Sequence, residues 1–257
     1  MRSTLGRILW HLGFPDQALA RCHEAVALAR QASDPFALAL ALIYDAELHG
    51  RRREIHLALE YAEAVISLSR EQGFTLYVGW GTVLRGWALA GQGSHSEGIA
   101  QMREGLNAHK AAGAILERPT LLGLLADAYG KAEQPEEGLR VLGEALALAH
   151  ETGERFDEPM LLRLKGELIL LLSAEEDGSS SLAEEAEVCL QQAIAIAHHQ
   201  VARSAELEAS ISLARLWQCW GRTNDARVML AGIHGMFIEG SDTADWQEAK
   251  KLLERLR

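Results

Sequence analysis

The sequence predicts an all-α protein: an α-solenoid, or right-handed superhelix, of six helical hairpins followed by a C-terminal capping helix. Two patterns lead to this fold class. Small residues recur at a fixed spacing along the chain, and apolar residues recur every three or four positions within each repeat. Strand-like alternation is absent from the sequence, so we expect one solenoid domain over residues 1–257 without a sheet.

Three columns of small or short side chains define an internal repeat of about 40 residues. The first column is Gly6, Ala46, Gly86, Ala126, Gly166 and Ala214. The second is Ala18, Ala58, Gly98, Gly138, Ala186 and Ala226, and the third is Ala25, Val65, Gly105, Ala145, Ala193 and Ile233. A glycine inside a helix costs about 1 kcal/mol relative to alanine, and close approach of two helices explains why Gly86 is tolerated.

The repeats are expected at approximately 1–33, 34–73, 74–113, 114–153, 154–200 and 201–240. Prolines mark expected helix starts, where the missing N–H costs nothing. These prolines are Pro15, Pro35, Pro119, Pro135 and Pro159. In the third repeat the turn lies at residues 91–94. The fifth repeat holds eight additional residues, which we assign to a polar loop around SAEEDGSSS, residues 173–181.

The last segment, 241–257, is predicted to contain the capping helix, from about Thr243 to Arg255. Ser241, Asp242 and Thr243 can cap its first turn, in which Asp245 is favourable. Its apolar face should cover the last hairpin and consists of Trp246, Ala249, Leu252 and Leu253.

The segment LADAYGKAEQPEEGLRVLGEAL, residues 125–146, resembles the tetratricopeptide repeat (TPR) in its leucine, aromatic and small-residue spacing. The usual TPR period is about 34 residues, so the helices here should be longer than standard. HEAT-type repeats have a similar length but lack this small-residue pattern. In such an array the first helix of each hairpin lines the concave side.

A narrower resemblance rests on WGTVLRGWALAGQG, LLADAYGKAEQPEEGL, RLKGELILL and the tail EGSDTADWQEAKKLLERL. These segments resemble the C-terminal repeat region of large bacterial signalling proteins. Such proteins carry a class III adenylate/guanylate cyclase or a DNA-binding domain, then an AAA-like ATPase, then the repeats. The resemblance implies that this chain is a sensor or scaffold segment of a larger architecture.

Composition restricts the partners and the location. The formal charge of -11 disfavours direct binding to nucleic acid. The longest apolar run, residues 168–172, is too short for a membrane span, and the first residues lack a signal-peptide pattern. Cys22, Cys189 and Cys219 form no CxxC pair and are expected as buried thiols in a reducing cytoplasm.

Sequence patterns for catalysis or cofactor binding are missing. Gly130-Lys131 is not followed by the Ser or Thr of a phosphate-binding loop, and neither GxSxG nor HExxH occurs. The ten histidines are expected at solvent-facing or helix-end positions, such as His95, His109 and His150. We therefore expect no enzymatic activity, no cofactor and no metal site.

The expected ligand-binding surface is the concave groove. The position after the first small column should face it, and this position is Arg7, Glu47, Trp87, Asp127, Glu167 and Arg215. With neighbours one turn earlier, the candidate site is Trp80, Trp87, Asp127, Met160, Arg163 and Glu167. In the alternative interpretation the tryptophans pack against neighbouring helices and the charges pair with one another.

Two functions fit these patterns. The first is a scaffold or protein-interaction module that binds a peptide or partner domain. The second is a small-molecule sensor that regulates an attached signal-transduction ATPase. To decide between these two functions the ligand must be identified, because many unrelated ligands fit such grooves.

Two further expectations concern unusual positions. Arg85 and Lys165 replace leucines of other repeats and should pair with carboxylates, Glu47 or Asp45 for the first and Asp127 for the second. The first hairpin should mediate a homodimer, because in this register no preceding helix covers its apolar residues. These residues are Leu5, Ile8, Leu9 and Trp10.

Overall fold

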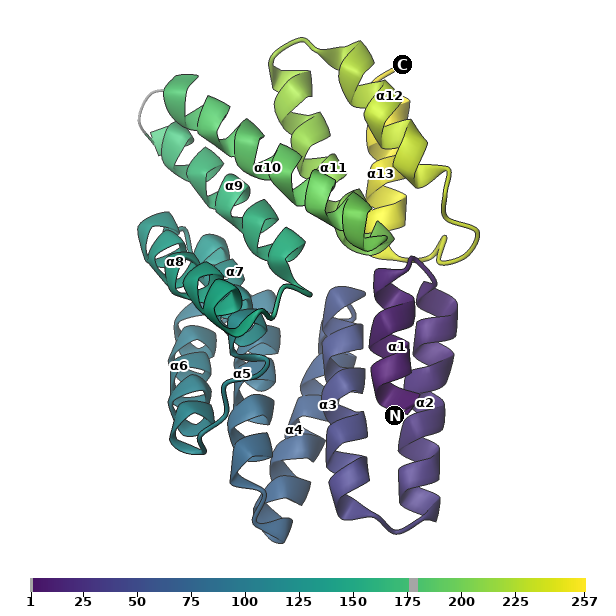
Figure 1. Ribbon diagram of the computed structural model, residues 1–257, viewed down its shortest axis with the longest axis vertical. Coiled ribbons are helices and arrows are strands. Elements are labelled where there is room, and N and C mark those ends of the chain that lie inside the picture. Colours follow the sequence, from purple (N-terminus) through teal and green to yellow (C-terminus); the bar gives the residue numbers. More distant parts are fainter. Residues whose placement is uncertain (1, 176–179) are drawn as a thin grey trace. The chain divides into compact units, whose positions relative to one another are not determined.

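The computed structural model describes residues 2–175 and 180–257, which form thirteen α-helices and contain no strand (Figure 1). The first six are α1 (Arg2–His11), α2 (Pro15–Gln31), α3 (Pro35–Arg51), α4 (Ile55–Gln72), α5 (Thr75–Gly91) and α6 (His95–Ala111). The next four are α7 (Arg118–Lys131), α8 (Pro135–Thr152), α9 (Glu158–Glu175) and α10 (Ser180–Gln200). The last three are α11 (Arg203–Cys219), α12 (Thr223–His234) and α13 (Ala244–Arg255). The predicted all-α class is confirmed.

Helices begin at or next to the prolines, as the sequence predicted. Pro15, Pro35 and Pro135 are the first residues of their helices, and Pro119 and Pro159 are the second residues of α7 and α9. At the start of α3 the Asp34 carboxylate accepts hydrogen bonds from the backbone N–H groups of Phe36 and Ala37 at 3.1 and 3.0 Å. Within the segment predicted as a polar loop, residues 176–179 lie outside the described residues.

The chain divides into two compact units. Unit 1 comprises Met1–Leu9 and Asp16–Glu154, and unit 2 comprises Trp10–Pro15 and Arg155–Arg257. Unit 1 therefore holds most of the first four hairpins, and unit 2 holds the last two hairpins with α13. A single domain over all six repeats stays a prediction.

Close packing of α5 against α6 explains the glycine columns. A Cβ atom at Gly86 would lie 2.5 Å from the carbonyl oxygen of Gly98 and 2.6 Å from Cγ of Met102. One at Gly105 would lie 2.6 Å from the carbonyl oxygen of Gly79. Real Cβ contacts are longer than this, so the backbones of the two helices approach closely because these side chains are missing. The prediction that Gly86 lies at a helix contact is confirmed.

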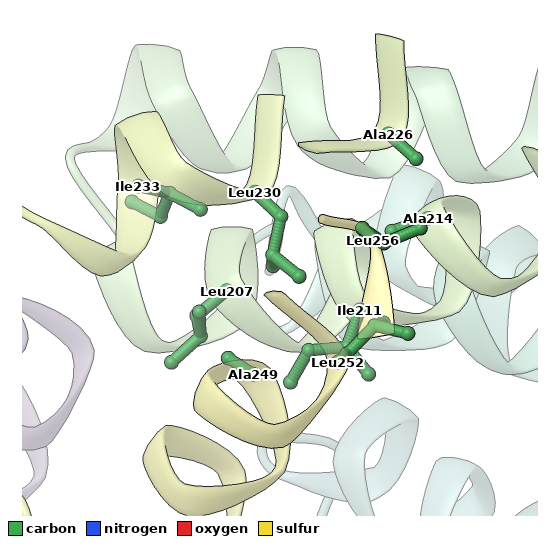
Figure 2. Packing of buried hydrophobic residues seen from close by; sticks show 9 residues of the cluster. All are labelled: Leu207, Ile211, Ala214, Ala226, Leu230, Ile233, Ala249, Leu252 and Leu256. Atoms are coloured by element: carbon green, nitrogen blue, oxygen red, sulfur yellow. The ribbon is translucent and has the colours of Figure 1, made fainter. Parts of the chain in front are cut away.

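The capping helix covers the last hairpin, as predicted. Helix α13 contacts both α11 and α12, and its Ala249 and Leu252 are buried among apolar side chains of those helices (Figure 2). The buried residues of this cluster are Leu207, Ile211, Ala214, Ala226, Leu230, Ile233, Ala249, Leu252 and Leu256. Trp246 packs its ring on that of His234, with centroids 4.6 Å apart.

The first hairpin differs from the expectation at one residue. Leu5 and Ile8 are exposed, but Trp10 is buried and belongs to unit 2. There its carbonyl oxygen accepts a hydrogen bond from the Ser204 hydroxyl at 2.5 Å. The prediction that Trp10 lacks a cover was wrong, since only 4% of this residue is exposed.

Candidate functional site

The first helices of successive hairpins lie in contact within each unit. Helix α5 contacts α3 and α7 in unit 1, and α11 contacts α9 and α13 in unit 2. We call the group of side chains that Tyr44, Glu47, Trp80, Trp87 and Asp127 form on α3, α5 and α7 the odd-helix face; Glu47 and Trp80 are its buried members.

Both tryptophans of this face donate hydrogen bonds to carboxylates on neighbouring hairpins. Nε1 of Trp80 lies 3.1 Å from Oε1 of Glu47, and Nε1 of Trp87 lies 2.8 Å from Oδ2 of Asp127. The pairs join α5 to α3 and to α7 respectively. Trp80 is only 5% exposed, whereas Trp87 is half-buried. These contacts agree with the alternative interpretation, in which the tryptophans pack against neighbouring helices. Of the two tryptophan rings, that of Trp87 is the more exposed.

A basic side chain lies beside Trp87. Nζ of Lys131 is 2.6 Å from Oδ2 of Asp127 and 5.9 Å from the centre of the Trp87 ring. An aromatic ring, a carboxylate and an ammonium group therefore lie together at partly exposed positions. Such a set can stack on an apolar group and hydrogen-bond a polar one.

Deeper in unit 1, Arg7 and Tyr44 form a second polar group. The Arg7 guanidinium donates a hydrogen bond to Oε1 of Glu117 at 2.5 Å and lies 6.0 Å from the Tyr44 ring. Burial, together with the charges of Glu117 and Glu47, raises the pKa of Tyr44 to about 12. The phenol therefore stays neutral and can donate or accept a hydrogen bond.

Glu117 is a residue that the repeat pattern did not single out. Its φ of 64° lies in the left-handed region, which is unusual for a residue other than glycine. Its backbone N–H donates to both carboxylate oxygens of Glu154, at 2.9 and 3.1 Å. Glu117 lies between hairpins, outside every column, so no periodic pattern could have paired it with Arg7.

The remaining candidates lie in unit 2. The Arg163 guanidinium donates to both carboxylate oxygens of Glu167, at 2.9 and 2.8 Å, and lies 3.2 Å from Oε2 of Glu208. The Ser212 hydroxyl donates to Glu167 at 2.5 Å, while Met160 is buried. The six predicted residues thus form two sets of three, one in each unit, and their role in binding stays a prediction.

The predicted partners of Arg85 and Lys165 were wrong. Nε of Arg85 lies 3.7 Å from Oε1 of Glu63 on α4, and Nζ of Lys165 lies 3.6 Å from Oε1 of Glu185 on α10. Adjacent helix positions point about 100° apart. In these two repeats the position before the small column therefore faces an even-numbered helix, whereas Glu47 and Trp87, at the position after it, contact an odd-numbered one.

Two expectations about buried groups need correction. Cys22 and Cys189 are buried as expected, but Cys219, at the end of α11, is exposed. His109 was expected at a solvent-facing or helix-end position; it lies in the last turn of α6 but is only 1% exposed. Its ring packs edge-to-face on Trp80, with centroids 6.2 Å apart.

The burial of His109 predicts an acid-sensitive stability. Burial, followed by the charge of Arg118, lowers the pKa of His109 below its ordinary 6.5. Below pH 6.5 the unfolded chain binds a proton that the folded chain does not, so this residue lowers stability as the pH falls. From pH 7 to about 5 we expect the free energy of unfolding in urea to fall less steeply for His109→Gln than for wild type. Parallel profiles of stability against pH for His109→Gln and wild type would contradict this. The control is His150→Gln, at an exposed position.

None of the described helices is both long enough and apolar enough to cross a membrane.

Comparison with known proteins identifies the fold. No protein-family model matches the chain, and no curated protein matches it. A solved structure of a Podosopora anserina protein, described as the Q17M form of a kinesin light chain with nearly identical TPR-like repeats, is 18% identical. It covers 74% of this chain and 92% of that one, with a TM-score of 0.50. A second structure, of the same Podosopora anserina protein but without Q17M in its description, is 16% identical to this chain. The similarity covers 83% of this chain and 95% of that one, with a TM-score of 0.49.

The first likeness shows that the described helices adopt a TPR-like repeat fold. Membership of the bacterial cyclase and ATPase signalling proteins has no match in these comparisons and stays a prediction.

Proposed function

We propose that the chain is a non-catalytic protein-interaction module that binds a peptide or partner domain through the odd-helix face. The TPR-like fold supports this function, since helical repeats generally present extended surfaces for protein partners. The observation that carries the proposal is the partly exposed group of Trp87, Asp127 and Lys131. Tryptophans in such surroundings are frequent energetic centres of interfaces.

Arg163 and Glu167 form the second proposed contact set, in unit 2. They are half-buried and joined to each other and to α11, which fixes their geometry for a polar partner. Met160, the third predicted residue of unit 2, is buried.

The wider context is also a proposal. We assign the module to the cytoplasm, as the C-terminal part of a bacterial signal-transduction ATPase or nucleotide cyclase, on the resemblance of its sequence segments alone. A homodimer through the first hairpin would use Leu5 and Ile8, which are exposed.

A displayed peptide library tests the interaction directly. We expect wild type to enrich defined peptides, and Trp87→Ala to bind those peptides at least about tenfold more weakly. Trp87→Phe, which keeps a ring but loses the bond to Asp127, should lose less. Trp220→Ala, at an exposed tryptophan after α11, is the matched control and should bind like wild type.

Equal binding by wild type and Trp87→Ala would contradict the proposal. A thermal-shift screen of metabolites separates the alternative function: saturable stabilisation by one small molecule, without peptide enrichment, would favour the sensor.

A further inference from the structure

Unit 1 also contains a cluster of potential metal ligands, none of which belongs to the odd-helix face. It consists of His23 on α2 and of Asp45 and His49 on α3. Nε2 of His49 lies 3.6 Å from Oδ1 of Asp45, and Nε2 of His23 lies 3.9 Å from the same oxygen. All three ligand atoms lie within 4.8 Å of one another. Asp45 and His49 share one face of α3 because they are four residues apart.

The two α3 residues are buried without hydrogen bonds at the atoms that face the cluster. Asp45 is 0% exposed and His49 is 2% exposed. Among the described residues, neither carboxylate oxygen of Asp45 has a hydrogen-bond partner, and neither has Nε2 of His49. Buried polar atoms are normally paired, and a cation bound between these three atoms would satisfy all of them.

The orientation of His49 is fixed from its other side. Nδ1 lies 2.5 Å from Oε2 of Glu54. Since a carboxylate only accepts hydrogen bonds, Nδ1–H is the donor, and in the neutral imidazole Nε2 is then the nitrogen with the free lone pair, 3.6 Å from Oδ1 of Asp45. Glu54 in turn accepts a hydrogen bond from Nε of Arg52 at 2.9 Å. The ring of Tyr61 stacks on the imidazole, with centroids 5.2 Å apart and an interplanar angle of 4°. A histidine that donates its second N–H to a carboxylate is the usual arrangement at metal sites.

We propose that His23, Asp45 and His49 bind one Zn²⁺ ion, with a water molecule as the fourth ligand and Glu54 as the outer-sphere partner of His49. Tetrahedral zinc with bonds of about 2.0–2.1 Å separates its ligand atoms by about 3.3 Å. The two distances to Asp45 exceed this by less than 1 Å. The side chain of His23 is 50% exposed, so it can move to close the difference. The ion would join α2 to α3 and neutralise the buried carboxylate.

Metal titration of the tag-free chain tests this site. After treatment with a chelator, we expect Co²⁺ to bind with one equivalent and to give the visible absorption of a tetrahedral complex, which Zn²⁺ then displaces. Zn²⁺ should also raise the melting temperature of wild type. His49→Ala, Asp45→Asn and His23→Gln should each weaken Co²⁺ binding by more than the roughly 10–100-fold expected for Glu54→Gln. His150→Gln removes an exposed histidine of α8 and should bind like wild type.

His23→Gln is the decisive variant, because its half-exposed position can change without loss of packing. Absence of saturable Co²⁺ binding by wild type would overturn the proposal. Wild-type affinity and spectrum in His23→Gln or in His49→Ala would overturn it as well. Loss of binding in these variants, with binding retained in His150→Gln, supports the site.

Discussion

Replacing Gly86 by leucine is expected to lower the free energy of unfolding by about 1–3 kcal/mol or more, although leucine is the better helix former. The reason is the contact between α5 and α6, where even a Cβ atom would lie 2.5 Å from the Gly98 carbonyl oxygen. Gly86→Ala should also destabilise, since alanine already adds this atom. Urea unfolding, followed by circular dichroism, measures both changes.

Gly143 provides the matched control for this prediction. It lies inside α8, and a Cβ atom there would meet no atom within 4 Å. Gly143→Ala should therefore stabilise by about 0.5–1 kcal/mol, the gain expected from helix propensity alone. If Gly86→Ala raised the free energy of unfolding as much as Gly143→Ala does, α5 and α6 would not be in close contact at Gly86.

Leu252→Ala should destabilise unit 2 by about 2–5 kcal/mol. Leu252 is buried in the cluster that joins α13 to α11 and α12, so truncation removes apolar contacts and leaves a cavity (Figure 2). Thermal unfolding measures the effect. Ile238→Ala, at a residue that is 82% exposed, should change stability by less than about 0.5 kcal/mol. Similar melting temperatures for both variants would mean that α13 does not stabilise the last hairpin.

Backbone packing was predictable because it depends on the size of side chains at a regular spacing. Gly86 and Gly98 occupy different columns of the repeat and meet as expected. The helix starts were equally predictable from the sequence, because proline favours the first turn of a helix whatever its tertiary surroundings. These features need only the period and the properties of single residues.

Side-chain partners were less predictable because they depend on the angles between hairpins and on rotamers. Arg85 contacts Glu63 instead of Glu47, and Arg7 reaches Glu117, 110 positions away. The histidines were misjudged for a similar reason. His49 and Asp45 carry a four-residue spacing, but His23 joins them only through the packing of the chain.

Hydrogen exchange of the chain, with and without a peptide selected from the library, tests most directly whether the odd-helix face is the binding surface. The account predicts additional protection in α3, α5 and α7, at segments containing Glu47, Trp87 and Asp127. Protection confined to α4, α6 and α8, with no change in α5, would contradict it.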